Sequence, residues 1–296
     1  MRVTVVGATG MIGRAVAGGL LARGDEVLAV SRGGRAGIDG ARDVRWDPAE
    51  GPPPPAALEA DAVVNVAGSK NDLLPWTASR KREFHESRVG TTRLLAEALG
   101  GEGGPRTLVN ASGADYYGPR EAPADETAPP GEGFLADVCA AWERAAVRAE
   151  GRGVRVVRLR SGIVLSAQGG ALPQMARPVR FFAGGPLGEG RQWIPWIHVD
   201  DQVGLNLLAL DDDAVAGPVN TASPGIVRQR EFVKHLAAVL RRPAVLPAPA
   251  IAVRLLLGEK ATLALDSRHI VPRAALDAGY AFRFTAAEAA LRDLLA

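Results

Sequence analysis

The chain has 296 residues, of which 47% are hydrophobic, and its formal net charge is only +2. A chain of this length buries roughly three quarters of the surface that it exposes when unfolded, so the composition predicts one large folded domain or two closely joined ones. No run of about 18 apolar residues occurs, which argues against a membrane span.

Arginine provides one charged feature, a run from Arg144 to Arg160 that could be an RNA-binding stripe. The interleaved acids Glu143 and Glu150, and a helix-to-strand boundary inside the run, favour ordinary scattered side chains instead. We therefore expect a small-molecule substrate, no nucleic-acid or membrane partner, and a monomer or homodimer.

The chain has a single cysteine, Cys139, which excludes an internal disulfide and a cysteine-based metal cluster within one chain. Its four histidines show no metal-ligand spacing, so no metal site is predicted. A strand pattern begins directly after Met1 and Arg2, without a cleavable export pattern. These features favour a reducing compartment, and we expect the protein in the cytoplasm.

Apolar runs of strand length alternate with helical patterns through the first two thirds of the chain. The expected strands are "RVTVVG", "EVLAV", "AVVNVAG", "TLVNAS" and "VRVVRLR", and the expected helices cover 11–23, 75–99 and 134–150. Continuous β-branched strands between amphipathic helices indicate a parallel sheet covered on both faces. The prediction is an α/β fold with a Rossmann-like, doubly wound parallel sheet.

Three glycines stand where the first strand meets the first helix, in "VTVVGATGMIGRAV". The first permits a tight turn, the second lets the backbone approach a pyrophosphate, and the third lets helix and strand pack closely. The amino end of the helix adds free N–H groups and the positive end of its dipole. The pattern predicts a dinucleotide site, with contacts expected from Gly7, Thr9, Gly10, Met11, Ile12 and Gly13.

The second strand ends at Val30 and is followed by Ser31 and Arg32, with no Asp or Glu. An acid there would pair with the ribose 2′-hydroxyl of NAD, whereas an arginine can bind the 2′-phosphate of NADP. The sequence therefore favours NADP(H) over NAD(H). The alternative is that Arg32 is an ordinary turn residue.

The later part of the chain has a different composition. Residues 33–58 form a surface connection with a short strand at 44–46, and glycine, proline and aromatic residues become frequent after Arg160. Helices are expected over 201–210 and 229–240, and a last one opens at Thr285 with Glu288 in a capping-box arrangement. We predict a dinucleotide-binding domain over 1–166 and 196–222. A smaller substrate or cap domain would cover 167–195 and 223–296, above the carboxyl edge of the sheet.

Further motifs are spread along nearly the whole chain. They include "NVAG", "ESRVGT", "ASGADYYG", "FLADVCAAWE", "RLRSGIVLSAQGGALPQM", "GGPLGEGRQWIPWIHVDD" and "GEKATLALDSRHIVPRAALDAGYAF". Together with "GATGMIG" they resemble the extended short-chain dehydrogenase/reductases, and within them an atypical epimerase-family branch with a C-terminal domain of unassigned role. The resemblance implies an NAD(P)-binding Rossmann fold and an oxidoreductase or epimerase-like activity.

The resemblance also implies positions for several site residues. Ala67 and Gly68 would lie beside the cofactor ribose, and Ser112 would orient the substrate. The loop expected to pass the nicotinamide amide consists of Ser161, Gly162 and Ile163.

Two positions depart from the superfamily's proton-transfer machinery. There, a tyrosine exchanges a proton with the substrate oxygen, and a lysine one helical turn later lowers the pKa of that tyrosine. This chain has Cys139 and Glu143 at the two places. A carboxylate would raise the pKa of a neighbouring acid, so Glu143 cannot replace the lysine. The usual mechanism is not expected, and a sugar-nucleotide epimerase working by it is disfavoured.

Other groups could supply the proton, namely Tyr116, Tyr117, Cys139 itself or Lys81. Ser112, Tyr117 and Cys139 are the candidate catalytic residues, although for Cys139 the role of a small buried hydrophobe is favoured over a catalytic one. Two functions stay open. One is an NADP(H)-dependent oxidoreductase or epimerase-like enzyme for a small polar substrate, and the other is an NADP(H)-binding regulator or sensor without catalysis.

The segment "RQWIPWIHVDD" also admits two interpretations. Its aromatic residues could form a wall for a substrate, with Arg191 facing an anionic group, or they could be core, with Asp200 capping the following helix. We favour core for Trp196 and His198 and keep Arg191 and Gln192 as substrate contacts.

Two further residues have alternative roles. Asp115 stands where the branch usually has glycine, and it places a carboxylate at the edge of the cleft or caps a turn. Trp142 is expected to pack rather than to contact substrate.

Overall fold

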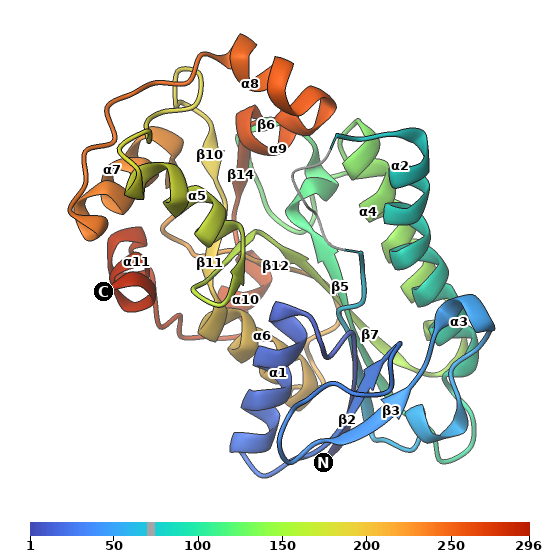
Figure 1. The fold of residues 1–296 in the computed structure, drawn as a ribbon. Helices are drawn as coiled ribbons and strands as arrows, with labels where there is room; N and C mark the ends of the chain where they lie inside the picture. Colours follow the sequence, from blue (N-terminus) through green and yellow to red (C-terminus); the bar gives the residue numbers. More distant parts are fainter. Residues whose placement is uncertain (70–74) are drawn as a thin grey trace.

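Seven strands form one fully parallel sheet in the order β12-β7-β5-β4-β1-β2-β3 (Figure 1). The computed structural model describes residues 1–69 and 75–296. The strands are β1 (Arg2–Val6), β2 (Glu26–Ser31), β3 (Arg42–Arg45), β4 (Ala62–Asn65), β5 (Thr107–Gly113), β7 (Arg155–Ser161) and β12 (Gly217–Thr221). The chain runs outward from β1 in both directions, which is the doubly wound order. The predicted fold class is confirmed.

Both faces of the sheet are buried. Val3 and Val5 of β1 join the core on one face, whereas Val6 joins the core on the other, because successive side chains of a strand point to opposite faces. The strands therefore appear in the sequence as continuous apolar runs rather than as alternating ones.

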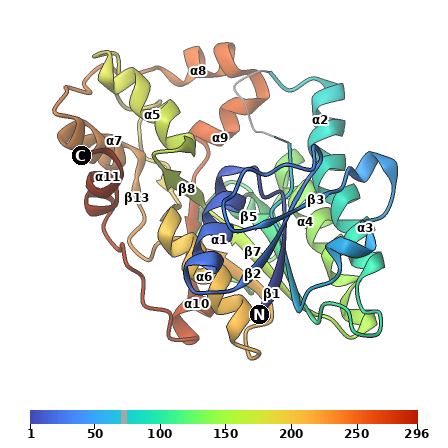
Figure 2. The same ribbon diagram turned by 60° about the horizontal axis from the view of Figure 1, so that its bottom comes forward.

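Helices cover the two faces (Figures 1 and 2). α1 (Met11–Ala22) packs against α6 (Val199–Asp211) on one face, and α3 (Thr91–Ala98) packs against α4 (Phe134–Val147) on the other. The helix expected over 75–99 is divided into α2 (Ala78–His85) and α3 by a π-helical turn, η3 (Glu86–Gly90). That turn carries residues of the "ESRVGT" motif toward the sheet.

A second, smaller core lies beyond the carboxyl ends of the strands, at the left of Figure 1. Leu172 of α5, Phe232 of α7 and Leu291 of α11 meet there around Trp196. Its elements are β8 (Ile163–Ser166), β9 (Gly169–Gly170), α5 (Ala171–Arg180), β10 (Trp193–Ile194), β11 (Trp196–His198), β13 (Val227–Arg228), α7 (Gln229–Leu240) and α11 (Ala287–Leu295). We call this part the cap.

Two segments connect the cap to the sheet. β6 (Arg120–Ala124), which follows β5, pairs in parallel with β14 (Arg268–Ile270) near the C-terminus. α10 (Arg273–Asp277) then packs on β12. α8 (Ala250–Leu257) and α9 (Thr262–Leu265) lie near the outer end of α2 in both views (Figures 1 and 2). The exact domain boundaries stay a prediction.

Two expected helix caps are wrong. α11 begins at Ala287 after the N-cap Ala286, which makes no side-chain hydrogen bond, so Thr285 and Glu288 do not form a capping box. The N-cap of α6 is His198, whose Nδ1 accepts the backbone N–H of Asp200 at 3.0 Å. In both cases the helix begins one or two residues away from the place that the sequence pattern indicates.

Within residues 1–69 and 75–296, no helix is long and apolar enough to cross a bilayer. No group of three or more His, Cys, Asp or Glu side chains in these residues is placed to hold a metal ion.

Helix α1 allows a matched test of close packing at the first strand. A Cβ on Gly13 would collide with the backbone of Gly7, whereas a Cβ on the exposed Gly18 would meet nothing within 4 Å. We expect Gly13→Ala to lower the free energy of unfolding by about 1–3 kcal/mol through overpacking. Gly18→Ala should raise it by about 0.5–1 kcal/mol because alanine is the better helix former. Urea denaturation measures both, and equal effects of the two changes would contradict the packing.

Candidate active site

Glycines at the β1–α1 junction leave room for a ligand to approach the backbone, because they have no side chains. Gly7 has a φ of +85°, and a Cβ there would lie 2.9 Å from the backbone of Ala67. A Cβ on Gly10 would lie 3.3 Å from the carbonyl oxygen of Gly7. Only glycine fits this turn without strain, which agrees with the expected tight turn.

No side chain of α1 or its N-cap neutralises the positive end of the dipole at the amino end of this helix. Gly10 is its N-cap, no side chain caps it, and no acid stands in its first turn. The first N–H groups of a helix have no partner within the helix, and the helix dipole is positive at this end. The site therefore suits a phosphate group.

A polar group without a partner lies at the end of β2. Ser31 is buried, and its Oγ has no hydrogen-bond partner in the described part of the chain. Arg32 follows directly and is exposed. A buried hydroxyl without a partner costs free energy, and a ribose or phosphate oxygen would satisfy it.

The predicted ribose contacts follow β4. Asn65 ends this strand, and its Nδ2 donates to Oγ1 of Thr92 at 2.8 Å and to Oδ1 of Asn110 at 2.7 Å. Its Oδ1 accepts the N–H of Ala67 at 3.2 Å, which fixes the backbone that leads to Gly68. Because β4 lies between β1 and β5, Gly68 emerges close to the glycine turn.

The loop after β7 is fixed by its neighbours. Oγ of Ser161 accepts from Oγ1 of Thr221 at 2.9 Å, and a Cβ on Gly162 would collide with the carbonyl of Pro195. Ile163 starts β8, which pairs with β11 of the cap. The loop thus links the main sheet to the cap, beside Gly113 of β5.

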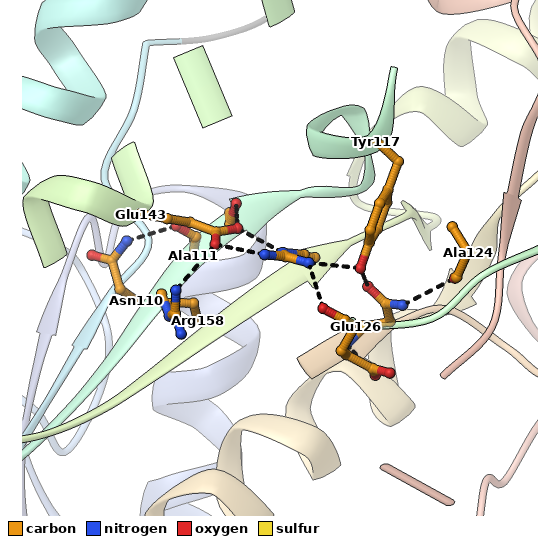
Figure 3. Close-up of polar contacts among 10 residues, drawn as sticks. Asn110, Ala111, Tyr117, Ala124, Glu126, Glu143 and Arg158 are labelled. Atoms are coloured by element: carbon orange, nitrogen blue, oxygen red, sulfur yellow. Dashed lines mark hydrogen bonds and ion pairs between the residues drawn. The ribbon is translucent and has the colours of Figure 1, made fainter. Parts of the chain in front are cut away.

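Glu143 is part of a buried ion pair. Its two carboxylate oxygens accept from Nε and Nη2 of Arg160 at 2.8 and 2.9 Å, and Oε1 also accepts from Oγ of Ser112 at 2.8 Å. Arg158 adds a longer contact at 3.4 Å (Figure 3). Glu143 therefore neutralises a buried arginine and orients Ser112, and it has no lysine-like role.

The hydrogen-bond network continues from Arg160 to the C-terminal part of the chain (Figure 3). Nη1 of Arg160 donates to the hydroxyl of Tyr117 at 2.8 Å, and that hydroxyl donates to Oδ1 of Asn220 at 2.7 Å. Nδ2 of Asn220 donates to the carbonyl of Val271 at 2.8 Å. One chain of polar contacts thus runs from β5 and α4 to the segment after β14.

This network does not support Tyr117 as the proton donor. Its side chain is 2% exposed, its proton is already donated to Asn220, and burial raises its pKa to about 12. The short 3₁₀ turn η4 (Ala114–Tyr117) directs it inward. Tyr116 packs against it, with the guanidinium of Arg160 3.5 Å from the centre of the Tyr116 ring.

Cys139 is buried on α4, next to the end of β5. A Cβ on Gly113 would lie 3.3 Å from its sulfur, so the thiol lies close to the strand that carries Ser112. Burial raises the pKa of Cys139 to about 12, and the charges of Asp115 and Glu143 act in the same direction. The thiol stays protonated at neutral pH and can donate a hydrogen bond, but it is a weak acid.

The residues of the segment "RQWIPWIHVDD" do not form a substrate site. Trp196 and His198 are core residues, as predicted. Gln192 is buried and donates to the carbonyls of Leu187 and Ala264, so it is not free to contact a substrate. Arg191 is exposed and pairs with Glu189 on the outside of the cap.

Ion pairs with the C-terminal part of the chain engage two further candidates. Lys81 pairs with Glu259, so its ammonium group is not free to act as an acid. The carboxylate of Asp115 pairs with Arg268 at 2.9 Å, so it connects the end of β5 to β14 and does not cap a turn. Trp142 is buried and donates to Oγ1 of Thr92 at 2.7 Å, as expected of a packing residue.

Arg160 is the main residue that the sequence interpretation missed. It belongs to the arginine run that was expected to be scattered, yet it is 3% exposed. The sequence contains an indication of this role, because Arg158 and Arg160 are two residues apart in β7 and therefore point to the same face of the sheet. Both contact Glu143 of α4 on that face.

Comparison with known proteins agrees with this geometry. A model of the NAD dependent epimerase/dehydratase family matches residues 3–222, and a domain of unknown function, DUF1731, matches residues 248–294. The chain belongs to the NAD dependent epimerase/dehydratase family. The resemblance noted in the sequence is thereby confirmed.

Relatives in this family are similar over all of this chain and over most or all of their own length. Epimerase family protein SDR39U1 of Mus musculus is 38% identical, and the match covers 100% of both chains. The chloroplastic SDR39U1 homolog of Arabidopsis thaliana is 36% identical over 100% of this chain and 87% of its own length. A crystal structure of human SDR39U1 with NADPH superposes with a TM-score of 0.90 at 38% identity, covering 100% of this chain and 99% of that one.

The buried pair at Glu143 generates a stability prediction. Glu143→Gln should lower the free energy of unfolding by about 3–5 kcal/mol, because the change leaves Arg160 buried without a counter-charge. Glu143→Lys, which restores the superfamily residue, should be worse because it adds a third cation beside Arg158 and Arg160. Glu97→Gln removes an exposed pair with Arg148 and should cost less than about 1 kcal/mol. Thermal and urea unfolding would contradict this account if Glu143→Lys were as stable as the parent protein.

Proposed function

We propose that the protein binds NADP(H) and uses it as an oxidoreductase or epimerase-like enzyme on a small polar substrate, without the superfamily's tyrosine and lysine. The observation that carries the cofactor proposal is the position of two adjacent residues, Ser31 and Arg32, at the end of β2. They follow a strand that leads to the same edge of the sheet as the amino end of α1, which no side chain caps. The NADPH in the human SDR39U1 structure supports it.

The residues present fit a phosphorylated dinucleotide. The backbone of Gly7 to Gly13, including Thr9, Met11 and Ile12, would hold the pyrophosphate at the amino end of α1. Ser31 and Arg32 would bind the 2′-phosphate. Ala67 and Gly68 would border the ribose, and the loop from Ser161 to Ile163 would border the nicotinamide amide.

The proposed reaction needs a hydride and a proton. Bound NADP(H) would supply or accept the hydride. Ser112 would orient the substrate in its alcohol form, because the Ser112 hydroxyl donates its proton to Glu143 and its lone pairs can accept a hydrogen bond from a substrate hydroxyl. Cys139 would contribute a protonated Sγ close to Ser112. Tyr117 is not part of this proposal.

One observation favours the alternative function. Burial raises the pKa of the Tyr117 hydroxyl and that of the Cys139 thiol to about 12, and the carboxylate of Glu143 is bound to Arg160. A cleft with no strong acid fits an NADP(H)-binding regulator or sensor that does not turn over a substrate.

The proposal extends to location, assembly and domain division. A lone buried Cys139 suits a reducing compartment, and we propose the cytoplasm, although the Arabidopsis relative is described as chloroplastic. We also propose a small-molecule substrate, a monomer or homodimer, and a cap formed by 167–195 and 223–296.

A spectroscopic assay separates the two functions. Purified protein is mixed with NADPH and a panel of small aldehydes, ketones and keto acids, and NADPH oxidation is followed by absorbance. The enzyme proposal expects turnover with at least one compound, and a loss of about 10²–10⁴ in rate for Cys139→Ala if its thiol donates to the substrate oxygen. Cys139→Ser is the matched control and should retain part of the rate. Tight NADPH binding with no oxidation of any compound would support the regulator instead.

The cofactor preference rests on Arg32. Arg32→Asp should weaken NADPH binding by roughly 10- to 100-fold, because a charge-assisted hydrogen bond to a phosphate contributes about 1.5–3 kcal/mol. NADH binding should change little. Arg82→Asp, on the exposed face of α2, is the control. Calorimetry with both nucleotides measures the effect, and equal NADPH affinity in the Arg32 variant would refute the assigned role.

A further inference from the structure

Arg88 lies directly beside Gly68, which follows β4. Its guanidinium carbon is 3.0 Å from the position that a Cβ on Gly68 would take. Nη2 donates to the carbonyl of Ser69 at 3.1 Å, and Nη1 donates to the carbonyl of Phe84 at 3.1 Å. The guanidinium therefore occupies the space that a side chain at position 68 would need, and it lies next to the predicted ribose contact.

Two aromatic rings hold the guanidinium in this position. Its central carbon is 3.5 Å from the centre of the Phe84 ring and 5.5 Å from that of Trp142. Arg88 belongs to the π-helical turn η3 between α2 and α3, and such turns are often found at functional sites. These two ring contacts restrict the orientation of the guanidinium.

The charge of Arg88 is not neutralised in the described part of the chain. Burial lowers its pKa to about 10, so it is still protonated at neutral pH. Its neighbours are the neutral thiol of Cys139 and the carboxylate of Asp115, which already pairs with Arg268. No carboxylate of residues 1–69 or 75–296 forms an ion pair with it.

Arg88 also keeps a free donor. Its side-chain hydrogen bonds in the described part of the chain use Nη1 and Nη2, and they go to two carbonyls and to Oγ of Ser87. Nε makes no hydrogen bond to any residue that the structure describes. By contrast, Arg160 uses Nε and Nη2 together to bind the carboxylate of Glu143.

We infer that Arg88 binds the carboxylate of the substrate, so that the protein acts on, or senses, a small monocarboxylic acid. This inference rests on the proposed function and names its substrate class. A guanidinium is planar and binds a carboxylate through paired N–H groups, and one arginine matches one negative charge. The position between Gly68 and Cys139 would place the acid between the proposed cofactor and α4.

The test compares matched acids and amides. Calorimetry measures the binding of acetate, oxamate and benzoate, and of acetamide and benzamide, to the full chain with and without NADPH. The acids should bind at least 10-fold more tightly than the amides. Arg88→Gln should abolish this preference and Arg88→Lys should keep part of it. The control Arg93→Gln, which removes an exposed pair with Glu97, should leave it unchanged.

The outcomes separate this inference from the cofactor proposal. Unchanged NADPH affinity in Arg88→Gln, with loss of the acid preference, supports a substrate role. Loss of NADPH affinity without any acid preference in the parent protein would overturn the inference and place Arg88 on the cofactor. Equal binding of acids and amides by the parent protein overturns it even where NADPH binds normally.

A measurement on the unmodified sequence covers the case in which the Arg88 variants do not fold. Phenylglyoxal labels accessible arginines, and peptide mass spectrometry reports the labelling of Arg88 alone. Benzoate should protect Arg88 at least 10-fold better than benzamide. The same rate of labelling with either compound would overturn the inference.

Discussion

Glu143 and Arg160 are both almost fully buried, and the carboxylate of the first accepts two hydrogen bonds from the guanidinium of the second. Neither charge could be buried alone without a large cost, so each residue requires the other. The pair also holds Ser112 on one side and Tyr117 on the other. The position that serves proton transfer elsewhere in the superfamily is used here to fix α4 on β7.

The consequence is a cleft with an unusual distribution of charge. α4 contributes a neutral thiol at Cys139 and a carboxylate, that of Glu143, which is bound to Arg160 and Ser112. Positive charge close to that thiol comes instead from Arg88, in the turn η3 that packs against α4. A substrate in this cleft would therefore be held mainly by its own negative charge, and proton transfer would depend on a weak acid.

Local sequence patterns predicted the fold well, but they did not predict ion pairs between residues far apart in the sequence. Apolar strands, the glycine turn at Gly7 and the absence of an acid after Val30 depend on neighbouring residues, which the sequence displays directly. The pair of Glu143 with Arg160 joins a helix to a strand, and its geometry depends on the face that each residue occupies. Tyr117 was misplaced because a short 3₁₀ turn rotates it inward, and η3, which positions Arg88, has no sequence signature.

The most direct test of this account is a crystal structure of the protein with NADPH. We expect the 2′-phosphate within hydrogen-bond distance of Arg32 and Ser31, with Glu143 still bound to Arg160 and Ser112. Glu143 turned toward the nicotinamide ribose, with Arg160 released, would contradict the central claim. So would a 2′-phosphate that contacts neither Ser31 nor Arg32.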